Sequence, residues 1–321
     1  MSTQQDQIRE ATVRNREEPD PGLERELLQL RFDAWPEIAV DPPTDQWPTP
    51  RPDLFPGGGI PDLPYTKLTS YILDSCIQHH NAVIVRGLLE PDQAEALNGD
   101  IDATLDAVHI AMGRAPGEVP PEWFTPFPGI GPDFEIAGKV FLHDSGTVWT
   151  GESPRTLFHL IDALEGRGLA TLLTDHLGER PALSLIKCAM RRVPPDAQGG
   201  WHQDGYVLGN DTRVLNVWIA TSACGSDAPG LDLLPRKMDT LAPTFLPPPL
   251  DFCVSDDTVA ELAVHHPVIR PEFAAGDAIF FDQLLLHRTG SGPGLTLPRY
   301  GFECWFFAPS TFPTKWVPIV F

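Results

Sequence analysis

Two histidines and an aspartate in the C-terminal half of the chain have residue types and spacing suited to a metal site. His202 and Asp204 are separated by one residue, so on an extended strand their side chains project from the same face. His287 follows an apolar run at 276–286 and can supply a further ligand from another strand. Two imidazoles and one carboxylate leave coordination positions open, an arrangement typical of non-haem Fe(II) that also binds a co-substrate and O₂.

Each of these residues also has an ordinary structural explanation. His202 alone could be a half-exposed histidine, Asp204 a turn residue before Gly205, and His287 a satisfied histidine of the apolar core. The metal interpretation is favoured because all three occur together. The sequence assigns none of the other histidines to the metal: His79, His80, His109, His143, His159, His176, His265 and His266.

Arg299 follows the second histidine and has the residue type that binds a carboxylate through two parallel hydrogen bonds. By strand alternation, Glu303 shares the face of Arg299 and Trp305. A buried carboxylate needs a partner, so we expect a basic or hydrogen-bonding group beside Glu303. The alternative is a bulge that turns Glu303 towards solvent.

The composition of the 321-residue chain limits the classes of partner. Apolar residues make up 42% of the sequence, which is enough for a full core. The net charge of −21 argues against a nucleic-acid or anionic-membrane partner, because phosphate binding needs a basic surface. No nucleic-acid or membrane partner is therefore expected.

The cysteines and the hydrophobic runs bear on the compartment. Five scattered cysteines form no CxxC pair, a pattern typical of reduced intracellular thiols. Residues 1–18 are polar, so no secretory signal is predicted. No run approaches the ~18–20 apolar residues of a membrane-spanning helix. We expect a cytoplasmic protein.

Residues 1–60 differ in character from the rest and are expected to form an N-terminal tail and a proline-rich arm. Residues 1–20 lack hydrophobic periodicity, which predicts a mobile tail. One short amphipathic helix is predicted from the spacing of Leu23, Leu27, Leu30 and Phe32. Prolines throughout 36–64 exclude regular helix and central strands.

The proline-rich segment is either a linker or an arm packed over the catalytic part. Four aromatic residues in or beside it favour the packed arm: Trp35, Trp47, Phe55 and Tyr65. Such an arm could border the substrate entrance or a subunit contact within a homodimer.

The remaining residues, 61–321, are predicted to form one domain with a helical part at 61–180 and a β core at 181–310. Four helices are expected: one at 66–80, one that begins at Pro91, one that begins at Pro154, and one that ends near Gly178. A strand is expected at 82–85 and a long loop at 113–138. Short β-like runs lie at 182–193, 214–222, 231–234, 264–269, 277–282 and 299–308. Helices followed by strands indicate an α+β chain around a closed or sandwiched β core.

Four stretches resemble the phytanoyl-CoA dioxygenase family of Fe(II)- and 2-oxoglutarate-dependent oxygenases. They are WHQDG at 201–205, LNVWIA at 215–220, APGLDLLP at 228–235, and HRTG at 287–290 with the Pro-Arg pair at 298–299. The resemblance is dense over 182–309, weaker over 66–180 and absent from 1–60. It implies a double-stranded β-helix, or jelly-roll, core with flanking N-terminal helices.

The resemblance also implies roles for the matching residues. His202, Asp204 and His287 would be the iron ligands, and Arg299 would form the salt bridge to the distal carboxylate of 2-oxoglutarate. Thr289 would hydrogen-bond the same carboxylate.

Three further residues are candidates for the co-substrate site. Trp218 would line it, although an aromatic core residue would satisfy the same position. Asn216 shares the face of Trp218 by strand alternation and so could point into the same cavity. Lys139 is similar to a family lysine that reaches the co-substrate, with a solvated lysine at a strand edge as the equal alternative.

The resemblance implies a dioxygenase that converts 2-oxoglutarate and O₂ to succinate and CO₂ while oxidising a small molecule, most simply by hydroxylation of a specialised metabolite. Relatives that halogenate lack a carboxylate at the position of Asp204, so we do not expect halogenation. The basic residues of the catalytic half could bind an anionic substrate, but offsetting nearby acids is the preferred explanation for each: Arg191, Arg192, Arg213, Arg236, Lys237 and Arg288.

Two other functions are compatible with parts of the pattern. An oxoglutarate-independent, cupin-like metal oxygenase or isomerase is disfavoured by Arg299 together with Thr289. A non-catalytic ligand-binding jelly roll is disfavoured by the intact ligand spacing. The sequence does not identify the substrate, because function depends on the site rather than the fold.

Overall fold

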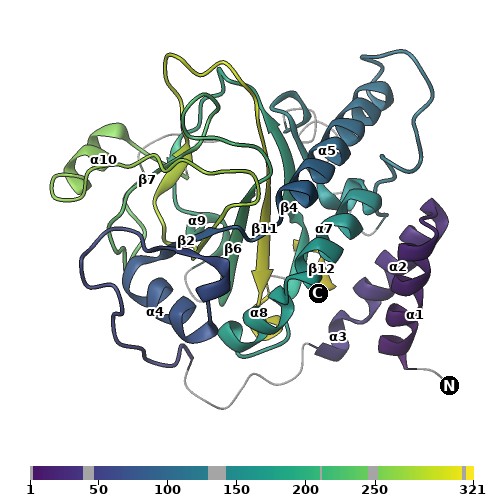
Figure 1. Ribbon diagram of the computed structural model, residues 1–321, viewed down its shortest axis with the longest axis horizontal. Coiled ribbons are helices and arrows are strands. Elements are labelled where there is room, and N and C mark those ends of the chain that lie inside the picture. The colour runs from purple at the N-terminus through teal and green to yellow at the C-terminus, as the bar shows by residue number, and fades with distance from the viewer. Residues whose placement is uncertain (1–2, 39–46, 129–141, 210–211, 245–251, 313–315) are drawn as a thin grey trace.

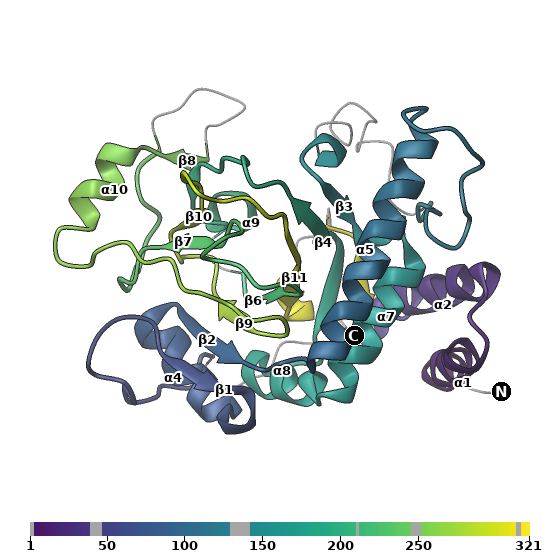
Figure 2. The same ribbon diagram turned by 45° about the horizontal axis from the view of Figure 1, so that its top comes forward.

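Two facing β-sheets form the centre of the molecule, and helices cover the outer side of the larger sheet (Figures 1 and 2). The computed structural model describes residues 3–38, 47–128, 142–209, 212–244, 252–312 and 316–321. The chain is α+β, and its β core is the predicted double-stranded β-helix. The cavity between the sheets holds the candidate site.

The larger sheet has the strand order β1-β2-β9-β6-β11-β4-β12, with β3 added beside β4. Its strands are β1 (Asp62–Pro64), β2 (Ala82–Arg86), β3 (Thr147–Trp149), β4 (Ala182–Val193), β6 (Val214–Ala220), β9 (Ala278–Phe281), β11 (Arg299–Phe307) and β12 (Pro318–Val320). All pairs are antiparallel except β1 with β2. The central strands are buried on both faces, because helices cover one side and the second sheet the other.

The smaller sheet has the order β7-β10-β5-β8. Its strands are β5 (Trp201–His202), β7 (Leu231–Leu233), β8 (Cys253–Val254) and β10 (His287–Thr289). The antiparallel register of β10 and β5 places His287 directly opposite His202. Beyond β8, the short helix α10 (Asp256–Leu262) begins at a Ser255 cap.

Four helices pack outside or beside the larger sheet: α4 (Ser70–His80), α5 (Pro91–Ala111), α7 (Pro154–Gly166) and α8 (Leu169–Leu177). Helices α5 and α7 begin with the expected first-turn prolines, and α8 ends at Gly178 in the left-handed conformation. The C-cap of α4 is Asn81, also left-handed, whose side-chain amide donates to Asp282 at 2.8 Å. This contact joins α4 to the end of β9.

The N-terminal region corrects the prediction of a tail at 1–20. Helix α1 (Gln4–Glu17) starts at a capping box of Thr3 and Asp6, and α2 (Pro21–Asp33) starts at an Asp20 cap followed by Pro21. The short helix α3 (Trp35–Ile38) follows, which corrects the expectation of no helix from residue 36 onward; Pro36 lies in its first turn, where proline is tolerated. Hydrophobic periodicity missed α1 because it buries little apolar surface, contributed mainly by Ile8 and Ala11.

Helix α2 packs against α7 and the edge strand β12. Its Arg31 is buried, donates to the carbonyl of Val320 at 3.0 Å and pairs with Glu165 on α7 at 3.3 Å. The N-terminal helices are therefore attached to the rest of the molecule by an ion pair as well as by packing.

The described part of the proline-rich segment, 47–64, is packed rather than free. The indole of Trp47 donates to the carbonyl of His176 at 2.9 Å, and Arg51 pairs with Asp74 on α4 at 3.1 Å. These contacts support the packed arm over the linker.

Other expectations differ in detail. The strand expected at 264–269 is reduced to a single bridge between Ile269 and Leu233. The long loop at 113–138 has no regular element as far as 128, and the remainder lies outside the described residues. No helix in the described part of the chain is long and apolar enough to cross a membrane.

Candidate metal centre and co-substrate pocket

The structure brings His202, Asp204 and His287 together at the smaller sheet. One ligand atom from each residue lies within 4.8 Å of the others, and no other such group of metal-ligating side chains occurs among the described residues. The two imidazole centroids are 4.4 Å apart, and His287 Nε2 lies 3.7 Å from Asp204 Oδ2. The three atoms can therefore hold one ion from one side.

The backbone fixes the orientation of both imidazoles. His202 Nδ1 lies 2.9 Å from the carbonyl of Gly200, and His287 Nδ1 lies 3.0 Å from that of Leu285. A carbonyl accepts, so each Nδ1 carries the hydrogen and each Nε2 keeps its lone pair for a metal. Burial, followed by the neighbouring His202, lowers the pKa of His287 to about 4, which keeps its ring neutral.

Asp204 reaches the site from a turn, which corrects the expectation of a continuous strand from His202. Strand β5 ends at His202, and Asp204 has helical dihedral angles at the start of α9 (Gly205–Leu208). The amide of Gly205 donates to the carbonyl of Gln283 at 2.9 Å, which ties this turn to the segment before β10. A Cβ on Gly205 would lie 2.8 Å from the end of the Leu241 side chain and 3.2 Å from the carbonyl oxygen of Gln283, so the turn has little space for a larger residue.

Arg299 is a buried cation with no carboxylate partner among the described residues. It is 1% exposed, and its Nη1 donates to the carbonyls of Gly230 and Pro229 at 3.0 and 3.4 Å. Its guanidinium lies over the ring of Trp218, 5.3 Å from the centroid. Burial, together with the nearby Arg191, lowers its pKa to about 10, so it remains charged at neutral pH.

A narrow cavity of about 70 Å³ joins the three candidate ligands to three of the predicted co-substrate residues, while Arg299 is not among the residues that line it. Thr289, Trp218 and Asn216 all line it, and Asn216 shares the cavity with Trp218 as strand alternation predicts. Leu231 and Phe281 complete the wall, and the Phe281 ring lies 4.9 Å from that of His287. Lys139 falls outside the described residues.

Two glycines allow close approach around Thr289. A Cβ on Gly199 would lie 2.9 Å from the Thr289 amide nitrogen, and one on Gly290 would lie 2.6 Å from Arg270 Nε. The wall beside Thr289 therefore has no space for added side chains.

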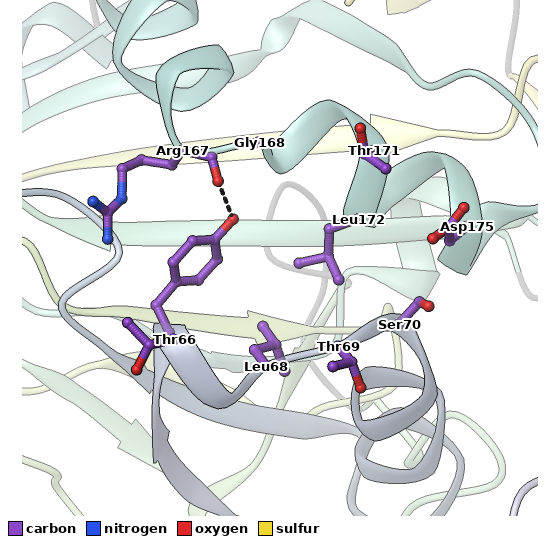
Figure 3. Close-up of a pocket in the computed structure, with 10 residues that line it drawn as sticks. Thr66, Leu68, Thr69, Ser70, Arg167, Gly168, Thr171, Leu172 and Asp175 are labelled. Carbon is purple, nitrogen blue, oxygen red and sulfur yellow. Dashed lines mark hydrogen bonds between the residues drawn. The ribbon is translucent and has the colours of Figure 1, made fainter.

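A larger hollow of about 460 Å³ lies between residues 65–70 and the start of α8 (Figure 3). In this hollow the Tyr65 hydroxyl donates to the carbonyl of Arg167 at 2.7 Å. None of the candidate ligands, and neither Thr289 nor Arg299, lines it. The three candidate metal ligands and Thr289 line the smaller cavity instead.

Glu303 points into the cavity and has the basic partner that the sequence predicts. Arg191 Nη1 lies 2.5 Å from Glu303 Oε1. Burial raises the pKa of Glu303, but Arg191 and then Arg299 lower it further, to about 2. Arg191 thus offsets an acid, as expected, but it does so inside the cavity, where its register opposite Gly301 places it.

Most other basic residues of this half pair with acids, as expected. The ion pairs include Arg192 with Asp102, Arg213 with Glu179, Lys237 with Asp239, and Arg288 with Asp232. Asp232 also pairs with Arg270 at 2.6 Å. Among these bases, only Arg191 lines the cavity.

A sequence profile of phytanoyl-CoA dioxygenase (PhyH) matches residues 79–293, more than half of the chain. The chain belongs to the phytanoyl-CoA dioxygenase family. The match covers all three candidate ligands and Thr289 and ends before Arg299. A search of curated proteins finds no match.

Solved structures with a similar fold include those of AviO1 and EctD. AviO1 from Streptomyces viridochromogenes Tue57 is 17% identical, with a TM-score of 0.46 over 74% of this chain and 94% of that chain. EctD from S. alaskensis, solved with 2-oxoglutarate and 5-hydroxyectoine, is 15% identical, with a TM-score of 0.49 over 84% and 86%. A third structure, EctD with bound Fe, is 15% identical, with a TM-score of 0.45 over 80% and 83%.

Proposed function

We propose that the protein is an Fe(II)- and 2-oxoglutarate-dependent dioxygenase that hydroxylates a small molecule, with release of succinate and CO₂. The observation that carries this proposal is the buried, carboxylate-free Arg299 in the same fold as the His202, Asp204 and His287 cluster. A buried cation that forms no ion pair with a described carboxylate is costly. A co-substrate carboxylate would supply the missing charge.

The donor set fits Fe(II). Two imidazoles and one carboxylate would bind the ion from one side, and backbone carbonyls fix the orientation of both rings. When bound, the iron would supply open coordination positions for the keto acid and for O₂, which is the oxidant of the reaction. The Asp204 carboxylate would occupy one coordination position of the iron, which favours hydroxylation over halogenation.

The protein's own residues bind and orient the co-substrate. Arg299 offers the charge for its distal carboxylate, and the Thr289 hydroxyl, on the cavity wall, offers a hydrogen bond to the same group. Trp218 packs against the Arg299 guanidinium and restricts its movement. Phe281 and Leu231 provide apolar walls that exclude water from the reacting atoms.

The proposal is tested by measuring succinate formation from 2-oxoglutarate under air, with Fe(II) added to metal-free protein. We expect succinate only when iron, 2-oxoglutarate and O₂ are all present, including slow formation without a substrate. Iron binding without any affinity for 2-oxoglutarate would instead support an oxoglutarate-independent enzyme. Binding of neither would contradict the proposal altogether.

A further inference from the structure

The ion pair of Arg191 and Glu303 lies inside the cavity rather than on the protein surface. Glu303 on β11 is paired in register with Ala189 on β4 and Trp218 on β6, while Arg191 lies opposite Gly301. Both charged side chains line the cavity and are 23% and 30% exposed. They can therefore contact a bound molecule.

The neighbouring ion pair provides a contrast. Arg192, the next residue of β4, pairs with Asp102 on α5 at 2.6 Å, and Tyr300 donates to the same carboxylate. These residues project from the opposite face of the strands and do not line the cavity. Two adjacent arginines thus form one structural ion pair and one ion pair that faces the reaction site.

The Glu303 carboxylate can accept more hydrogen bonds than the described residues donate to it. Arg191 binds Oε1, and no other described residue donates a hydrogen bond to this carboxylate. A carboxylate can accept about four hydrogen bonds, so Oε2 remains available to a ligand. Asn216 lines the same cavity, and its Oδ1 has no donor among the described residues.

The charges around Glu303 indicate which ligand group would match it. The charge of Arg299 is opposed by Arg191 and attracted by Glu303. A co-substrate carboxylate bound to Arg299 would become its main counter-ion. Glu303 would then be the anion that faces the substrate. The protein's net charge of −21 also attracts cations to its surface.

We propose that the substrate carries a protonated amine, which binds Glu303 through the oxygen that Arg191 leaves free. The inference rests on the proposed function and narrows its substrate class. An ammonium group brings one positive charge and three N–H donors, which suit the Glu303 carboxylate and the Asn216 amide oxygen. Arg191 holds the carboxylate in position from the other side.

The test compares three compounds with one carbon skeleton: butylamine, 1-butanol and butanoate. The protein is loaded with Zn(II) and 2-oxoglutarate so that no turnover occurs, and dissociation constants are measured by ligand-observed NMR. We expect butylamine to bind about tenfold or more tightly than either of the other two, as for a charge-assisted hydrogen bond. Glu303→Gln should abolish this preference.

Asp102→Asn is the matched control, because it removes one carboxylate from the neighbouring ion pair outside the cavity. It should leave the preference for butylamine intact. Equal binding of the three compounds, tighter binding of butanoate, or a preference that survives Glu303→Gln would overturn the inference. If Zn(II) or 2-oxoglutarate fails to bind at the start, the proposed function itself is contradicted; if both bind without an amine preference, only this inference fails.

Discussion

Arg31 and Arg299 are both almost fully buried, but their surroundings differ. Arg31, in the N-terminal layer, donates to a backbone carbonyl and pairs with Glu165 on α7. Arg299, on the cavity side of β11, contacts carbonyls and an aromatic ring but no described carboxylate. The comparison indicates that the first arginine stabilises the fold, whereas the second is placed for a ligand. Stability and co-substrate binding should therefore respond to different substitutions.

The largest effect is expected from removing a metal ligand. His202→Ala leaves two candidate ligands, which cannot hold Fe(II) well, so iron binding and succinate formation should both be lost. Iron content is measured by metal analysis after equilibration with Fe(II) under argon. His266→Ala is the control, since that histidine lies outside the cluster. Near-normal iron content in His202→Ala would show that the cluster is not the metal site.

Arg299→Ala should weaken 2-oxoglutarate binding while iron remains bound. Loss of one partner of a buried charge pair costs on the order of 3–5 kcal/mol, which corresponds to more than about a hundredfold in affinity. The apparent KM for 2-oxoglutarate and the iron content are the two measurements. Arg299→Lys should recover only part of the loss, because lysine cannot form the two parallel bonds. An unchanged KM would mean that another cation binds the co-substrate.

Arg31→Ala should show the opposite pattern. The variant loses hydrogen bonds to Val320 and Glu165 and should be destabilised by about 1.5–3 kcal/mol, with an unchanged KM for 2-oxoglutarate. Denaturant unfolding measures the loss. Arg16→Ala provides the control, because Arg16 pairs with Asp162 and Glu165 at an exposed position and should cost at most about 1 kcal/mol. A raised KM for 2-oxoglutarate in Arg31→Ala would contradict the assignment of Arg31 to stability alone.

The smallest effect is expected from Gly199→Ala. The new Cβ would lie 2.9 Å from the Thr289 nitrogen, so β10 must shift by a few tenths of an ångström. We expect the KM for 2-oxoglutarate to rise several-fold, or about 1 kcal/mol, with little change in iron content. Gly57→Ala is the control, since its Cβ would meet open space. Equal kinetics in both variants would show that the Thr289 position is not critical.

Much of the β core could be predicted because its strands have apolar patterns of their own. The run at 182–193 coincides with β4, and those at 214–222 and 299–308 extend one or two residues beyond β6 and β11. Strands β5 and β8 have two residues each and exist only through pairing across the sheet, so no local pattern could reveal them.

The candidate site, too, could be predicted from the sequence only in part. The sequence predicted the convergence of His202, Asp204 and His287, although Asp204 arrives by a turn that local alternation did not suggest. The need of Glu303 for a basic partner followed from its face on the strand. The identity of that partner depends on register, because Arg191 lies opposite Gly301 only after β4 and β11 pair. Helix α1 was missed because capping, rather than hydrophobic periodicity, marks its start.

The contact between Asn81 and Asp282 has a consequence for the response of the protein to pH. Burial raises the pKa of Asp282 to about 6, although Lys237 and the Asn81 hydrogen bond act in the other direction. A carboxyl whose pKa is higher in the folded than in the unfolded protein favours folding when protonated, and this contribution is lost as the pH rises through about 6. Asp282 should therefore add to stability as the pH falls from about 7 to about 5, whereas a further rise above neutral pH should change its contribution little.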